Sequence, residues 1–209
     1  MGQQLEVGAS AGLSQHASFV SSSWCDDRQT RPGGSVMTER LLDQKTLRRA
    51  FELLATGLKR RRVVGEVHIF GGAAMVLAFN SRESTRDVDA VFAPDTQVLE
   101  AAHEVAVEMR LPKSWLNNQA SSYVSGVAGR GTPVFDHPNL RVMITPTEHL
   151  LAMKVRAARA VRDADDIRVL LRELKLTKVA QVKKIVEKYF ADVPLSARSL
   201  ALIEEVLGE

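Results

Sequence analysis

Two aspartates one residue apart, Asp87 and Asp89, are the side chains of this sequence that are best placed for chemistry. They lie in the segment 87–92, whose polar and apolar residues alternate as in a β-strand, so both carboxylates would project from one face. Two converging carboxylates repel each other unless a cation lies between them, and Mg²⁺ or Mn²⁺ suits carboxylate and phosphate oxygens. The pair therefore predicts a divalent-metal site of the kind that supports phosphoryl or nucleotidyl transfer.

Two adjacent glycines, Gly71 and Gly72, form a second chemical feature. They follow the apolar run 67–70, which is typical of a buried strand, and they precede the helix-forming residues 73–78. The glycines are therefore expected at the N-terminus of a helix, where free backbone N–H groups attract an anion. Because glycine has no Cβ, a phosphate chain can approach the main chain closely at this point.

The polar segment between the glycines and the aspartates is also suited to a phosphate group, because it contains Arg82, Ser84 and Thr85. We expect these three residues, together with Gly71 and Gly72, to bind a nucleoside triphosphate. Taken alone, a glycine pair is most often an ordinary turn, and a D-x-D pair is most often not a metal site. The order of strand, Gly-Gly, helix, basic loop and D-x-D strand is a more specific pattern.

That order of elements resembles the nucleotidyltransferase fold of polymerase-β-like enzymes. More narrowly, GGAAM together with RESTRDVDAVF resembles the AbiEii-type nucleotidyltransferase toxins of type IV toxin–antitoxin systems, over roughly residues 40–175. The resemblance implies that a nucleoside monophosphate moves from a nucleoside triphosphate to an acceptor hydroxyl, with a tRNA 3′ end or another RNA as acceptor. It also implies a toxin that a cognate antitoxin protein neutralises.

Three charged residues later in the chain, Lys154, Asp163 and Asp166, match the lysine and the acids that complete the active site in the AbiEii-like pattern. A lysine can offset the charge that develops on departing pyrophosphate, and an aspartate can orient a metal ligand or accept a proton from the attacking hydroxyl. The alternative is a surface lysine with acids that cap helices, Asp163 capping one that runs to Arg172. The strand expected over 140–144 has no acid in its interior, which argues against simple three-carboxylate chemistry.

The segment 111–131 interrupts the pattern of strands and helices with polar and glycine-rich residues, so we expect a long loop beside the active site. Proteins similar to this one often carry its Trp-Leu-Asn segment, which implies that Trp115 and Asn117 shape the substrate cleft. For Trp115, a hydrophobic plug is favoured over a platform for base stacking.

The pattern along the whole chain predicts an α/β (α+β) fold, in which flanking helices cover a small mixed β-sheet and a helical C-terminal part follows. Residues 1–36 are rich in Ser, Gly and Gln and are expected to be disordered, although a chain that begins at Met37 is an alternative. Residues 37–145 are expected to form the nucleotidyltransferase core, and residues 146–209 to complete the site. The other expected elements are a helix from Asp43 to about Leu58, a helix over 95–110, a hairpin over 133–144, a helix launched at Thr145 that continues over 149–171, and helices that begin at Thr177 and Pro194.

Lysines and arginines concentrate in two stretches, Lys45–Arg62 and Lys178–Lys188. A run of like charge is most often a solvated face, but these stretches could also bind the phosphate backbone of RNA. The formal net charge is +3 and the pI is near 9.2, which permits a nucleic-acid partner without requiring one.

With 209 residues, 45% of them hydrophobic, the chain can bury a core. It has no apolar run of the roughly 20 residues needed to cross a bilayer and no signal-peptide pattern, so we expect a cytoplasmic protein with no membrane contact. The single cysteine, Cys25, excludes an intramolecular disulfide, and the five histidines lack an H-E-x-x-H spacing, which disfavours a zinc hydrolase. Two other functions stay open: a transferase that modifies a protein or small molecule, and an inactive relative that only binds nucleotide.

Overall fold

The structure, a computed structural model, describes residues 41–119, 131–157 and 160–208. They belong to one unit of the chain, Thr38–Glu209. The segment 1–36, which we expected to be disordered, lies outside the described residues, as do residues 120–130 of the expected loop. Among the helices that the structure describes, none combines the length and the apolar character needed to cross a membrane.

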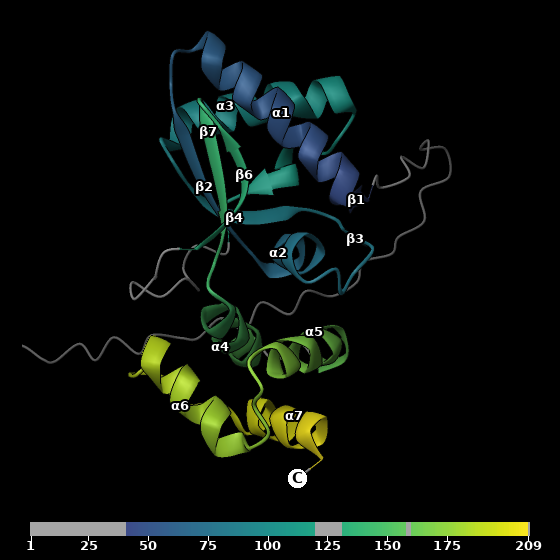
Figure 1. The fold of residues 1–209 in the computed structure, drawn as a ribbon, viewed down its shortest axis with the longest axis vertical. Coiled ribbons are helices and arrows are strands. Elements are labelled where there is room, and N and C mark those ends of the chain that lie inside the picture. The colour runs from purple at the N-terminus through teal and green to yellow at the C-terminus, as the bar shows by residue number, and fades with distance from the viewer. Residues whose placement is uncertain (1–40, 120–130, 158–159, 209) are drawn as a thin grey trace, which may run out of the picture. The chain divides into compact units, whose positions relative to one another are not determined.

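A mixed sheet in the order β5-β4-β2-β7-β6 forms the centre of the described fold (Figure 1). Its strands are β2 (Gly65–Phe70), β4 (Val88–Ala93), β5 (Leu116–Asn117), β6 (Thr132–His137) and β7 (Leu140–Ile144). Strand β2 runs antiparallel to β4 and parallel to β7. A separate small sheet pairs β1 (Leu42–Asp43) with β3 (Ser84–Thr85). The predicted α/β class with a small mixed sheet is therefore confirmed.

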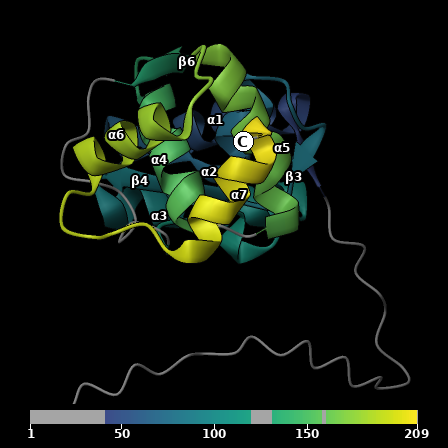
Figure 2. The ribbon, with the colours of Figure 1, turned by 90° about the horizontal axis from the view of Figure 1, so that it is seen from below.

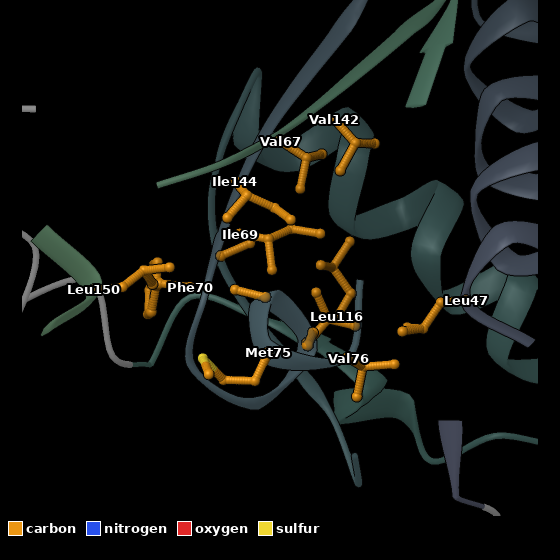
Figure 3. Close-up of a cluster of buried hydrophobic side chains, with 14 of the residues drawn as sticks. Leu47, Val67, Ile69, Phe70, Met75, Val76, Leu116, Val142, Ile144 and Leu150 are labelled. Atoms are coloured by element: carbon orange, nitrogen blue, oxygen red, sulfur yellow. The ribbon is translucent and has the colours of Figure 1, made fainter. Parts of the chain in front are cut away.

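Helices α1 (Gln44–Arg60) and α3 (Asp95–Met109) pack against each other and against strands of the large sheet. Burial alternates along strand β4: Val88, Ala90 and Phe92 are buried, and the residues between them are not. Figure 3 shows part of this core, with labelled side chains from α1, β2, β5 and β7 among them. The packing leaves the opposite side of β4 available for polar groups.

Local sequence explains how α1 begins and which side it buries. Asp43 caps the helix by accepting a hydrogen bond from the Thr46 backbone N–H at 2.7 Å. Hydrogen bonds with the Thr46 side chain and backbone lower the pKa of Asp43. The predicted apolar positions are buried, namely Leu47, Ala50, Phe51, Leu54 and Leu58. The expected helix is confirmed and continues to Arg60.

The prediction of a long loop after α3 is wrong in part. A short 3₁₀ helix, Lys113–Trp115, leads into β5, which extends the sheet by pairing in parallel with β4. A strand of two residues is too short to show alternation, so the sequence carried no periodic signal for it. The hairpin that follows is confirmed as β6 and β7, with its turn at Pro138 and Asn139.

Four helices form the C-terminal part and pack on one another (Figure 1, Figure 2). They are α4 (Thr147–Ala157), α5 (Ala160–Glu173), α6 (Val179–Tyr189) and α7 (Ala197–Leu207). The helical C-terminal part is therefore confirmed, but the segment expected as one helix after Thr145 forms both α4 and α5. The buried ring of His149 on α4 stacks on Tyr189 of α6, with ring centroids 4.5 Å apart.

The starts of the last two helices differ from expectation by a few residues. Helix α6 begins after Lys178 rather than Thr177, and the Gln181 side chain accepts hydrogen bonds from the backbone N–H groups of both. Helix α7 begins three residues after Pro194, because Ser196 provides the N-cap. In both places a side-chain acceptor sets the start of the helix.

Candidate active site

The turn between β2 and α2 (Gly71–Ala78) brings two glycines against the segment that carries the aspartates. Gly71 has φ of +69°, in the left-handed region that favours glycine, and a Cβ on it would lie 3.0 Å from Oδ2 of Asp89. A Cβ on Gly72 would lie 2.6 Å from Oγ1 of Thr85. The main chain at the start of α2 therefore lies close to a carboxylate and a hydroxyl, and a side chain at either glycine would require its neighbour to move.

The start of α2 is also suited to an anion. Its N-cap residue, Phe70, makes no capping hydrogen bond through its side chain, and the first turn of the helix contains no acidic residue. Backbone N–H groups at such a helix end favour a negative charge. The predicted order of strand, glycine turn and helix is confirmed, and its use for phosphate binding stays a prediction.

The two aspartates flank the buried residue Val88 at the start of β4. Asp89 is half-buried and pairs in register with Phe70, the last residue of β2, so it lies beside the glycine turn. Asp87 is exposed and precedes the strand, and its backbone carbonyl accepts a hydrogen bond from Oγ1 of Thr85 at 3.1 Å. One threonine thus contacts both the glycine turn and the main chain at Asp87.

The donor groups at this point fit Mg²⁺ or Mn²⁺. One or two carboxylates suffice for such an ion when water and a triphosphate supply the other oxygen ligands. Among the residues that the structure describes, no three His, Cys, Asp or Glu side chains gather into a metal site. Asp163 and Asp166 are therefore not grouped with Asp87 and Asp89 as ligands of one ion, and metal binding by Asp87 and Asp89 stays a prediction.

A cluster of four charged side chains lies next to the glycine turn. Arg82 donates from Nε and Nη2 to the two oxygens of Asp166, at 2.7 and 2.6 Å, and its Nη1 lies 4.0 Å from the position of a Cβ on Gly72. Nζ of Lys154 lies 2.6 Å from Oδ2 of Asp166 and 2.8 Å from Oδ1 of Asp163. The buried charge cluster, as we name it, consists of Arg82, Lys154, Asp163 and Asp166.

The cluster joins predicted site residues from distant parts of the chain. Arg82 lies before β3, Lys154 lies on α4, and the two aspartates lie on α5. The alternative of a surface lysine with capping acids is wrong, because Lys154 is largely buried between two carboxylates. Asp163 lies inside α5, which begins at Ala160, and so it is not the N-cap. The action of these residues on a nucleotide stays a prediction.

The two hydroxyl residues of β3 have different surroundings. Thr85 approaches Gly72, whereas Ser84 pairs in register with Asp43 of β1. The structure thus brings Thr85 to the glycine turn and shows no such approach for Ser84 among the nearest atoms.

One residue from the segment expected as a loop, Asn117, lies beside Asp89. Asn117 is the register neighbour of Asp89 in the parallel pair of β4 and β5, so the two side chains share one face of the sheet. Its Oδ1 accepts a hydrogen bond from the Gln119 N–H at 3.1 Å. Trp115 is fully buried and donates from Nε1 to the Ala102 carbonyl at 2.9 Å, which confirms the hydrophobic plug.

The basic residues at the two ends of α1 differ in their pairing. At the C-terminal end, Glu104 of α3 lies 2.7 Å from Arg60 and 2.6 Å from Arg61. The hydrogen bonds that Arg61 donates to Glu104 raise the pKa of Arg61, and the hydrogen bonds from Arg61 and Arg60 lower the pKa of Glu104. Near the N-terminal end, Lys45 and Arg48 are exposed and make no ion pair with any residue that the structure describes.

Known proteins provide an independent comparison. Residues 45–201 match the family described as "Nucleotidyltransferase of unknown function (DUF6036)". No curated protein and no solved structure shows significant similarity to the chain. The matched residues include the glycine turn, both aspartates and the whole buried charge cluster. Since the match covers most of the sequence and all of the candidate site, the chain belongs to this family of nucleotidyltransferases.

Proposed function

We propose that this nucleotidyltransferase is metal-dependent and moves a nucleoside monophosphate from a nucleoside triphosphate to an acceptor hydroxyl. The observation that carries the proposal is the close approach of Gly71 to Asp89. At that point a helix end that attracts phosphate adjoins a carboxylate that attracts a divalent cation. A triphosphate with its metal ion needs both groups in one place.

The triphosphate is held by main chain and side chains around the glycine turn. The backbone N–H groups that follow Gly71 and Gly72 face the phosphates at the start of α2. Arg82, whose Nη1 lies 4.0 Å from the position of a Cβ on Gly72, adds a positive charge, and the Thr85 hydroxyl adds a polar contact. These groups orient the α-phosphorus for attack by the acceptor.

The transfer itself forms one bond to phosphorus and breaks another. The acceptor oxygen bonds to the α-phosphorus, the bond from that phosphorus to the pyrophosphate oxygen breaks, and the acceptor proton passes to solvent. Asp87 and Asp89 would hold Mg²⁺ or Mn²⁺, which when bound stabilises negative charge on the phosphates. Lys154 supports the charge that builds on the departing pyrophosphate, with Asp163 holding its ammonium group.

Replacing either aspartate tests this assignment. We expect Asp87→Asn and Asp89→Asn to abolish transfer, because each removes a metal-binding charge at nearly constant size. The fold should persist, since one side chain is exposed and the other half-buried. Asp136→Asn changes an exposed aspartate on β6 and is the matched control, which should keep full activity. Near-normal turnover in either site variant would show that the site lies elsewhere.

RNA is the acceptor that the charge distribution favours. Lys45, Arg48 and Arg49, which we name the α1 basic face, are exposed along the first turns of α1, although Arg49 also pairs with Glu52 at 3.2 Å. Helix α1 follows β1 directly, and β1 pairs with β3, so this face begins close to Thr85. A polyanion bound along it would reach the glycine turn.

Salt dependence separates an RNA acceptor from a small one. In a plot of the logarithm of RNA affinity against the logarithm of salt concentration, each phosphate contact to a single strand contributes about 0.7 to the slope. The double variant Lys45→Gln with Arg48→Gln should therefore flatten the slope by about 1.4. Arg60→Gln with Arg61→Gln removes the same charge where Glu100 and Glu104 already neutralise it, and should change the slope much less. A flat slope in the wild type would favour a small-molecule acceptor, and equal flattening by both pairs would refute the role of the α1 basic face.

A finer proposal is that the acceptor is a tRNA 3′ end and that the protein is a toxin neutralised by a cognate antitoxin. It is supported by the resemblance of segments 71–75 and 82–92 to AbiEii-type toxins. Induced expression in a bacterial host should stop growth with the wild-type chain and not with Asp89→Asn. Normal growth with active wild-type enzyme would contradict the toxin role and leave nucleotidyl transfer intact.

A further inference from the structure

The carboxylate of Asp166 contacts two cations and almost no solvent. We propose that Asp166 is a positioning residue, which fixes the guanidinium of Arg82 so that Nη1 faces the phosphate-binding turn at Gly72. The inference rests on the proposed function, because the phosphate in question belongs to the nucleoside triphosphate. It differs from the role expected from sequence, in which Asp166 orients a metal ligand or accepts a proton.

The geometry of the guanidinium group supports this role. Nε of Arg82 donates to Oδ1 of Asp166 at 2.7 Å, and Nη2 donates to Oδ2 at 2.6 Å. A guanidinium is planar and its donors are fixed relative to one another, so two bonds along one edge set the direction of the remaining nitrogen. That nitrogen, Nη1, lies 4.0 Å from the position of a Cβ on Gly72. The carboxylate therefore aims Arg82 at the start of α2.

Both oxygens of Asp166 are already engaged. Oδ2, besides its bond to Arg82, lies 2.6 Å from Nζ of Lys154, and only 1% of the side chain is exposed. Lys154 is itself held by Asp163 at 2.8 Å. A carboxylate that contacts two cations and has almost no exposed surface is poorly placed to bind a metal ion or the acceptor. Holding cations in place is the role that its contacts support.

The pair also links two parts of the fold. Arg82 and Asp166 are 84 positions apart in the sequence. Among the described elements, helices α4 to α7 pack extensively only on one another, so the ion pair is a direct connection from α5 to the segment beside the glycine turn. Loss of Asp166 should therefore change how Arg82 meets a phosphate while the turn itself is retained.

Ligand binding by the full chain tests the proposal without requiring turnover. Calorimetry would measure the affinity for inorganic tripolyphosphate and for each magnesium nucleoside triphosphate. We expect Asp166→Asn to weaken both about tenfold or more, the scale of a lost charge-assisted hydrogen bond. Asp165→Asn alters the neighbouring exposed aspartate, which pairs with Arg168, and as the matched control should leave both affinities unchanged.

Variants of Arg82 separate positioning from charge. Arg82→Lys keeps the charge but lacks the planar fork, so it should lose as much affinity as Arg82→Gln. In the Arg82→Gln background, Asp166→Asn should cause no further loss, because no guanidinium is left to position. If Asp166→Asn weakens binding as much in the Arg82→Gln background as in the wild type, Asp166 acts independently of Arg82, and the proposal is overturned.

Simple Coulomb repulsion predicts the opposite change in affinity for Asp166→Asn, since removing a negative charge near a triphosphate should tighten its binding. Unchanged or tighter binding by Asp166→Asn, or full affinity of Arg82→Lys, would overturn the positioning role and leave the proposed function intact. A wild-type chain that binds neither ligand would overturn both. If Asp166→Asn does not fold, the decision rests on Arg82→Lys, which preserves the charge balance of the cluster.

Discussion

Replacing Lys154 by Met should destabilise the protein strongly, because it removes a cation shared by two buried carboxylates. Lys154, Asp163 and Asp166 have side chains that are 11%, 7% and 1% exposed. Removing one partner of a buried ion pair costs about 3–5 kcal/mol, because the other charge is left uncompensated. Arg82 still neutralises Asp166, so we expect the lower end, about 3 kcal/mol. For a chain of this length, that loss lowers Tm by roughly 6–12 °C.

Urea unfolding followed by circular dichroism measures this loss. Lys188→Met is the matched control, because Lys188 lies 2.6 Å from Glu148 but both side chains are largely in water, 55% and 39% exposed. Solvent screens such a pair, so Lys188→Met should lower the unfolding free energy much less than Lys154→Met, although the N···O distances in the two ion pairs are similar. Equal losses in the two variants would refute the reasoning that burial sets the energy.

A second substitution checks the cause of the loss. In the Lys154→Met background, Asp163→Asn should restore part of the stability, because it removes a buried charge that the first change left uncompensated. In the wild-type background the same change should be destabilising. Full additivity of the two losses would show that they act through unrelated contacts.

Two further predictions concern burial and backbone conformation. Burial lowers the pKa of His149 from its ordinary 6.5, so the unfolded chain takes up a proton first as the pH falls, and stability should decline below about pH 6.5. His149→Phe, which can still stack on Tyr189, should flatten the pH dependence of the unfolding free energy below about pH 6.5, and an unaltered slope would contradict this. Gly71→Ala should lower the unfolding free energy by about 1–2 kcal/mol and weaken nucleotide binding. The backbone at Gly71 is left-handed, and a Cβ at this position would press against the Asp89 carboxylate. Gly208→Ala has a similar φ of +74° with no atom within 4 Å, so as the control it should leave nucleotide binding unchanged, and equal weakening by both would refute the contact.

Local sequence patterns were sufficient to predict the scaffold of the site. The apolar run that stops at Gly71 and Gly72 and the alternation around Asp89 are each encoded within a few adjacent residues, and β2, α2 and β4 follow them. The cap of α1 at Asp43 is equally local. Such elements depend on backbone preferences and burial over short stretches, which a single sequence displays.

Contacts between distant residues could not be predicted in the same way. Residue type shows that Arg82 and Asp166 carry opposite charges. They are 84 positions apart in the sequence, so their pairing depends on where α5 packs in the fold. Similarly, Arg60 and Arg61 have the pattern of a basic patch, and only the packing of α3 against α1 brings Glu100 and Glu104 to neutralise them. Tertiary packing, rather than local pattern, decides which charges are available to a ligand.

The central claim is that the glycine turn and the two aspartates carry out nucleotidyl transfer, and label transfer tests it most directly. The chain would be incubated with Mg²⁺, total RNA and each nucleoside triphosphate labelled at the α-phosphate. We predict that at least one triphosphate labels RNA, and that both metal chelation and Asp89→Asn abolish the label. Label confined to protein or a small molecule would retain transfer and change the acceptor. Wild-type labelling by Asp89→Asn, or no labelled product from any triphosphate, would contradict the claim.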